Sequence, residues 1–207
     1  NAIALFTELS IPITNKFQVN GAIRYEELEN DSSFDPKISL RYEMSDNLIL
    51  RASLSTSFRE ASLSQLYASG VGLQGIQDFN EDGTPKGGTT FIRIAQDGNA
   101  KLSPEESDNF NIGAIWRPQS NLELKLDYWS IDYSDVITIE SAQGIVTASP
   151  FVKAVKRTID RTLVGVTTKY FNASNVKTDG IDFAINYSQD FSLGYIDLGL
   201  NGTYINK

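Results

Sequence analysis

The sequence predicts an all-β protein, specifically a segment of an antiparallel β-barrel that crosses a membrane. Apolar and polar residues alternate in repeated runs, so that Val19, Ile23 and Tyr25 share one face of a strand while Gln18 and Arg24 occupy the other. Each run covers about 9–11 residues, which is the length that a tilted strand needs to cross a bilayer. The second face repeatedly carries full charges, as the polar interior of an outer-membrane barrel does.

We expect eight strands, joined by short and long connections in alternation. The strands are residues 2–11, 16–27, 36–44, 48–58, 108–117, 122–134, 164–187 and 193–205. The tight turns, rich in Pro, Asn, Asp and Ser, are residues 12–15, 45–47, 118–121 and 188–190. The long connections are residues 28–35, 59–107 and 135–163. This asymmetry is typical of bacterial outer-membrane barrels, with the turns in the periplasm and the long loops outside the cell.

Residues 164–187 are predicted as one strand because this alternation requires it. A break at residues 172–175 would move the turn at 188–190 to the side of the long loops. The second half of this strand then faces lipid through Ile181, Phe183, Ile185 and Tyr187.

Composition disfavours several classes of function. Cysteine and histidine are both absent, which removes disulfides, thiol nucleophiles, the commonest general base and the commonest transition-metal ligand. The net charge of −8 disfavours binding to nucleic acid, since phosphate contacts need clustered Lys and Arg. We therefore expect neither an enzyme, nor a cofactor, nor a nucleic-acid partner. Apolar runs of only a few residues predict no transmembrane helix.

Five segments, in the right order, resemble the barrel of TonB-dependent outer-membrane receptors. They are residues 35–42, 55–62, 99–107, 126–132 and 178–182. In the second segment a strand closes in Phe58 and Arg59, and Ser62 follows three residues later. The third segment resembles the Asn-x-x-Leu-x-Pro-Glu-x-Ser stretch of that family, with Leu102 and Pro104 in place.

The resemblance implies a barrel of about 22 strands whose lumen is closed by a separate plug domain. Residues 1–207 would supply about eight of these strands, and the plug and both barrel ends would lie outside the chain. The implied function is TonB-coupled uptake of a scarce nutrient such as a ferric siderophore, cobalamin, a saccharide or a peptide. The implied partners are TonB with its inner-membrane energising complex, outer-membrane lipid, lipopolysaccharide and the nutrient, in a Gram-negative cell.

Two other interpretations share the alternating strands. One is a passive porin-like channel or structural outer-membrane barrel, without a plug or energy coupling. The other is a soluble β-sandwich that acts as a binding module. The sandwich requires that the face carrying Phe17 and Tyr25 be buried against a second sheet.

The polar strand faces would place charged side chains in the barrel lumen, where they need partners or water. These residues are Arg24, Glu26, Arg41, Glu43, Arg51, Glu123, Lys125 and Asp127. The long loops supply the candidate contacts to a ligand, because loops of this length are usually functional or disordered. The ligand-binding candidates are Arg59, Tyr67, Phe91, Arg93, Lys153 and Arg157. The structural alternative is that these side chains pack the loops onto themselves.

Two local patterns lie within the long loops. In residues 150–161, Phe151, Val155 and Ile159 recur at helical spacing after Pro150, which predicts a short amphipathic helix. Its basic residues, Lys153, Lys156, Arg157 and Arg161, would attract a carboxylate-bearing or ferric-siderophore ligand or lipopolysaccharide phosphates, unless they form only a solvated face.

The other pattern has the opening spacing of a calcium loop. Asp78, Asn80 and Asp82 alternate before Gly83, but Thr89 stands where a bidentate Glu is expected. An acidic turn is the alternative to a calcium site.

Overall fold

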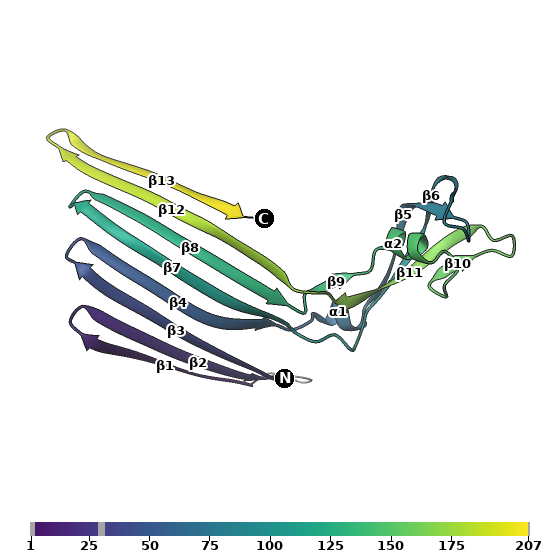
Figure 1. Cartoon of the computed structure of the whole chain (residues 1–207), viewed down its shortest axis with the longest axis horizontal. Coiled ribbons are helices and arrows are strands. Elements are labelled where there is room, and N and C mark those ends of the chain that lie inside the picture. Colours follow the sequence, from purple (N-terminus) through teal and green to yellow (C-terminus); the bar gives the residue numbers. More distant parts are fainter. Residues whose placement is uncertain (1–2, 29–31, 207) are drawn as a thin grey trace. The chain divides into compact units, whose positions relative to one another are not determined.

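The computed structural model describes residues 3–28 and 32–206, which form two compact units (Figure 1). Unit 1 comprises the described residues of 1–59, 106–134 and 175–206, and unit 2 comprises residues 60–105 and 135–174. Each unit is built on its own β-sheet. Unit 2 is therefore made from the two long segments that the sequence assigns to loops.

Unit 1 is one eight-stranded antiparallel sheet, as predicted. Its strands are β1 (Ile3–Thr14), β2 (Phe17–Glu27), β3 (Ser32–Ser45), β4 (Leu48–Arg59), β7 (Glu105–Gln119), β8 (Leu122–Ser134), β12 (Val176–Phe191) and β13 (Gly194–Asn206). They lie in the order β1-β2-β3-β4-β7-β8-β12-β13, so each strand pairs with the next one that the chain contributes to the sheet. The prediction of a long connection at 28–35 is wrong for residues 32–35, which are part of β3 and pair with β2, while residues 29–31 lie outside the described residues.

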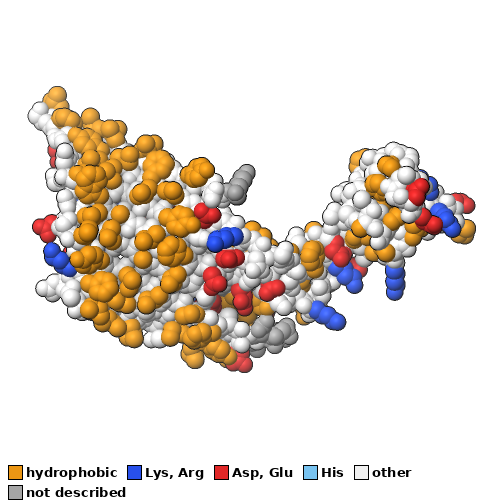
Figure 2. Space-filling view, viewed as in Figure 1, with side chains coloured by type: hydrophobic (Ala, Val, Ile, Leu, Met, Phe, Trp, Pro, Cys, Tyr) orange, Lys and Arg blue, Asp and Glu red, His pale blue; other side chains and the backbone are white. Residues whose placement is uncertain are grey.

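The strand register gives this sheet one apolar and one polar face. Ile11, Val19, Leu40 and Ala52 are paired in one row across β1 to β4. On the apolar face, side chains gather over the strands (Figure 2) and remain exposed to 44% at Ile23 and 55% at Leu54. Among its described residues, unit 1 contains this one sheet and no second sheet packed on its apolar face, whereas the β-sandwich interpretation requires two packed sheets.

Unit 2 contains five strands and two short helices. They are α1 (Leu63–Tyr67), β5 (Ser69–Phe79), β6 (Pro85–Asp97), β9 (Ile137–Ile139), α2 (Ala142–Ala148), β10 (Val155–Arg157) and β11 (Leu163–Asn172). The sheet order is β10-β11-β6-β5, and β9 pairs with β11. The parallel pairing of β6 with β11 joins the two long segments into one body. A small core, including Ile76, Ile92 and Val166, packs against Val146 of α2.

Two predictions about this region are wrong. Residues 150–161 do not form a helix: Val155 is buried and pairs with Val166 as part of β10, while Ile159 is fully exposed. The helical spacing of the apolar residues is thus overridden by antiparallel pairing with β11, the next strand along the chain.

Residues 164–187 are not one strand either. The chain leaves β11 at Asn172 and starts β12 at Val176, so β11 belongs to unit 2 and β12 to unit 1. Because β11 is not a strand of the eight-stranded sheet, the turn between β12 and β13 still lies at the same end of that sheet as the other tight turns. Ile181 and Phe183 lie on the apolar face as expected, each 41% exposed.

Within the described residues, no helix combines the length and the apolar character that a membrane span requires.

Candidate ligand-binding surface

The sheet of unit 2 has one covered and one open face. Alternation in β5 and β6 directs Ile76 and Ile92 into the core beneath α2. The open face, which we call the groove face, is lined by Val71, Leu73, Phe91, Ala95, Arg93, Lys156 and Gly165. These residues surround a groove of about 670 Å³. Three of its apolar side chains are unusually exposed: Val71 and Leu73 to 72% and Phe91 to 76%.

Two cations of the groove face stand in one row across three strands. Lys156 of β10 pairs with Gly165 of β11, and Gly165 pairs with Arg93 of β6. Two interstrand spacings separate the cations, which places their backbones about 10 Å apart. Neither cation has a carboxylate within 4.0 Å in the described part of the chain.

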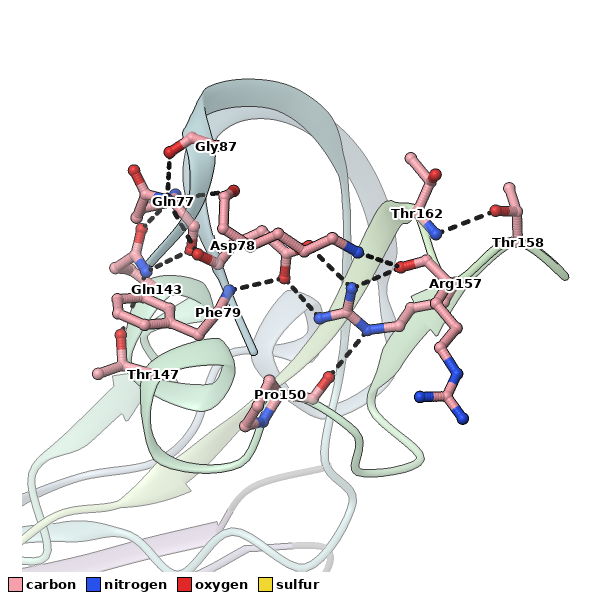
Figure 3. A network of polar contacts seen from close by, with 12 residues as sticks. Gln77, Asp78, Phe79, Gly87, Gln143, Thr147, Pro150, Arg157, Thr158 and Thr162 are labelled. Atoms are coloured by element: carbon pink, nitrogen blue, oxygen red, sulfur yellow. Dashed lines mark hydrogen bonds and ion pairs between the residues drawn. The ribbon is translucent and has the colours of Figure 1, made fainter. Parts of the chain in front are cut away.

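Arg157, by contrast, is committed to an internal ion pair on the core side (Figure 3). Its two Nη atoms donate to the Asp78 carboxylate at 2.9 and 2.5 Å, and its Nε donates to the carbonyl of Pro150 at 3.0 Å. The guanidinium carbon lies 4.6 Å from the centre of the Phe151 ring. The side chains of Arg157 and Asp78 are only 9% and 13% exposed.

This ion pair has a structural role, because each charge has its partner within unit 2. The hydrogen bonds from Arg157 hold the pKa of the Asp78 carboxyl below its ordinary value, so this group is a carboxylate at neutral pH. Because the pair joins β5 to the segment after α2, it holds the two long segments of unit 2 together. Arg157, predicted as a ligand contact, therefore stabilises the unit from within.

The other predicted ligand contacts are dispersed. Phe91 and Arg93 lie together on the groove face. Tyr67 is 63% exposed on α1, Lys153 lies in the turn before β10, and Arg59 ends β4. Val71, Leu73 and Gly165 also line the groove face but are not among the predicted contacts, although the alternation of residues in β5 and β11 was an available signal. No local pattern shows that β6 and β11 are neighbours.

The residues of the calcium pattern have other partners. Asp78 binds Arg157, Asn80 Nδ2 donates to Thr84 Oγ1 at 3.0 Å, and Asp82 accepts from the backbone N–H of Thr84 at 3.0 Å. The hydrogen bonds from Thr84 also lower the pKa of Asp82. These contacts shape the acidic turn between β5 and β6. Among the described residues, no three His, Cys, Asp or Glu side chains are grouped closely enough to hold a metal ion.

The charged residues predicted for the lumen share the polar face of unit 1. Arg51 donates through Nε and Nη2 to the two carboxylate oxygens of Asp127, at 2.9 and 2.6 Å, from β4 across β7 to β8. Gly113 of β7 makes this possible, since an added Cβ would clash with Asp127 Oδ1. The other pairs are Arg24 with Glu26, Arg41 with Glu43, and Glu123 with both Lys125 and Arg117.

Comparison with solved structures shows a shared fold at low sequence identity. A mutant of the ferric enterobactin receptor PfeA of Pseudomonas aeruginosa, in complex with enterobactin, superposes with a TM-score of 0.74 at 17% identity, covering 100% of this chain and 27% of PfeA. The siderophore receptor PirA of Acinetobacter baumannii gives 0.70 at 15% identity, covering 99% of this chain and 27% of PirA.

A more distant similarity is to a double mutant of the Serratia marcescens hemophore receptor HasR, in complex with its hemophore HasA and heme. It gives a TM-score of 0.65 at 13% identity, covering 98% of this chain and 34% of HasR. The chain thus spans about a quarter to a third of the length of these receptors. No curated protein matches it in sequence.

A protein-family model gives the decisive comparison. The model described as "TonB dependent receptor-like, beta-barrel" matches residues 1–206. This agrees with the eight-stranded sheet, with its two-faced register and with the five resembling segments. The chain therefore belongs to the TonB-dependent receptors, a family of outer-membrane transport receptors rather than enzymes, and it forms part of their β-barrel.

Proposed function

We propose that the whole protein is an outer-membrane receptor that binds a small iron-carrying chelate at the cell surface and imports it with energy transmitted by TonB. In this proposal, unit 1 is a section of the barrel wall and unit 2 is the extracellular part that contacts the ligand. No bond is broken, because the chelate is bound and passed inward intact.

The observation that carries the proposal is the two-faced sheet of unit 1. Its apolar face stays uncovered, with Leu126 exposed to 56% and Ile112 to 50%. Leaving such a face in water is unfavourable, whereas lipid accepts it at no comparable cost. Its opposite face bears paired charges such as Arg51 and Asp127, which suit a lumen that holds water or a plug domain.

Unit 2 supports the ligand-binding part of the proposal. Both of its segments leave the sheet at the same end, where β4 and β8 finish and β7 and β12 begin. The tight turns between the other strand pairs lie at the opposite end. By the asymmetry of bacterial barrels, the end with the long segments faces outward, where a nutrient arrives.

The choice of an iron chelate comes from the neighbours' ligands. PfeA is a ferric enterobactin receptor, PirA a siderophore receptor, and HasR was solved with heme and a hemophore. The further partners in this proposal are TonB with its inner-membrane complex, a plug domain, and the lipid and lipopolysaccharide of a Gram-negative outer membrane.

The proposal is tested by calorimetry on the whole receptor purified in detergent. We expect one member of a panel of ferric siderophores and heme to bind, and binding to be lost when residues 60–105 and 135–174 are each replaced by short Gly-Ser linkers. The barrel of the shortened receptor should keep its thermal unfolding transition, which serves as the control. Equal binding by the shortened receptor, or no binding by any chelate, would contradict the proposal.

A further inference from the structure

We propose that Arg93, Lys156 and Gly165 form an anion-binding cradle for a planar organic anion with at least two negatively charged oxygens. Leu73 and Phe91 contact the apolar body of this anion. The inference rests on the proposed function and deepens it, because it names the chemistry of the ligand that the groove face takes.

The charge of the cradle is not neutralised within the described part of the chain. The other two arginines of unit 2 near this sheet have carboxylate partners: Arg157 binds Asp78, and Arg161 lies 3.4 Å from Glu81. Arg93 and Lys156 lack one, although the chain carries 26 acidic against 18 basic residues. Two unneutralised cations in one row make a local positive potential that attracts anions. The planar guanidinium of Arg93 also matches a carboxylate in geometry.

Gly165 sets the depth of the cradle between the two cations. A Cβ at this position would lie 3.1 Å from the carbonyl oxygen of Arg93 and 3.8 Å from Cβ of Lys156. Without it, the strip of β11 between the two side chains is bare backbone, which a flat group can approach closely. A branched side chain at residue 165 would fill this space.

The apolar side of the groove face excludes a bare inorganic anion as the best occupant. Phe91 and Leu73 stand beside Arg93, exposed to 76% and 72%. Inorganic phosphate would satisfy the cations and leave these side chains in water. A planar organic anion covers them with its ring while its charged ends reach Arg93 and Lys156, so both parts of the surface find a partner.

The cradle is tested by saturation-transfer NMR on the whole receptor in detergent. The probe is terephthalate, a benzene ring with a carboxylate at each end, and the matched probe is its uncharged diamide. We expect saturation transfer to terephthalate at least tenfold stronger than to the diamide. It should be lost in the Arg93→Ala/Lys156→Ala double variant and in Gly165→Val. Lys101→Ala, which removes an exposed charge of unit 2 outside the groove face, should leave the signal unchanged.

The outcomes separate the cradle from the proposed function. Both alanine substitutions replace groove-face side chains that pair with no carboxylate, so loss of signal in the double variant reports on binding and not on folding. Equal transfer to both probes, or a full signal in the double variant, overturns the cradle whether or not the receptor imports a chelate. Failure of chelate binding with an intact terephthalate signal would overturn the proposed function alone.

Discussion

At the scale of single residues, the ion pair between Arg157 and Asp78 is far less exposed than the pair between Arg161 and Glu81 in the same unit. Two parallel hydrogen bonds, low exposure and the Phe151 ring above the guanidinium combine in one place. From the sequence, Arg157 is predicted to contact a ligand, because a basic residue in a long loop gives no sign of a partly buried carboxylate 79 positions away.

Arg157→Ala should therefore destabilise unit 2. Removing one member of a partly buried ion pair leaves the other charge without its partner, and we expect a loss of about 1–3 kcal/mol in the local free energy of unfolding. Hydrogen exchange of the amides in β5 and β10, measured in the whole receptor, reports this loss. The control is Arg161→Ala, whose pair with Glu81 is about 70% exposed and should cost less than about 1 kcal/mol. Similar losses of unfolding free energy in both variants would show that the Arg157–Asp78 ion pair has no special structural role.

The same pair predicts a dependence on pH. The folded-state pKa of Asp78 is lowered by Arg157, so its contribution is complete above the ordinary aspartate pKa of about 4. This contribution to stability is lost as the pH falls below the ordinary pKa and through the lowered pKa of Asp78 in the folded state. Exchange protection of β5, corrected for intrinsic rates, should decline below about pH 4 in the native receptor. Asp78→Asn should show lower protection and no such decline; an identical decline in that variant would assign the effect to another group.

At the scale of elements, local pattern predicts the strands of unit 1 and fails for unit 2. Apolar alternation predicts eight strands, and the sheet has eight, seven of them in nearly the predicted places, because each strand shows the alternation of a sheet with one apolar and one polar face. The strand β11 instead pairs in parallel with β6, about 70 residues away, and β10 pairs with β11. Parallel pairing across such a distance leaves no local signature, so the prediction of 164–187 as one strand joins β11 to β12. The three-residue strand β10 is too short to show alternation, so the helical spacing of apolar residues dominates the prediction for 150–161.

A glycine in β7 offers a test at this scale. Gly113→Ala places a methyl group where Arg51 and Asp127 meet, and should lower barrel stability by about 1–3 kcal/mol through overpacking and a displaced ion pair. Thermal unfolding of the detergent-solubilised receptor measures the change. Gly199→Ala is the matched control, because its added Cβ would meet only Asn186 Oδ1 at an ordinary 3.6 Å. If both variants unfold at the same temperature as the unmodified receptor, Gly113 does not have the role described here.

At the scale of the whole molecule, the account makes the apolar face of unit 1 a lipid-facing wall. Ile23→Arg should then cost about 2–4 kcal/mol, the cost of a cation near the centre of a bilayer. Urea unfolding of the receptor in lipid vesicles gives this value. Asn20→Arg, on the polar face of the same strand, is the control and should be nearly neutral. The opposite ranking would mean that the face carrying Asn20 contacts the lipid.

The most direct test of the central claim is the uptake of radioactive iron as the receptor's bound chelate, in cells that express the whole protein with or without functional TonB. The account predicts that iron accumulates in the cells only when both the receptor and TonB are present. Equal accumulation without TonB would show that the protein is a passive channel, and the proposed energy-coupled import would be wrong.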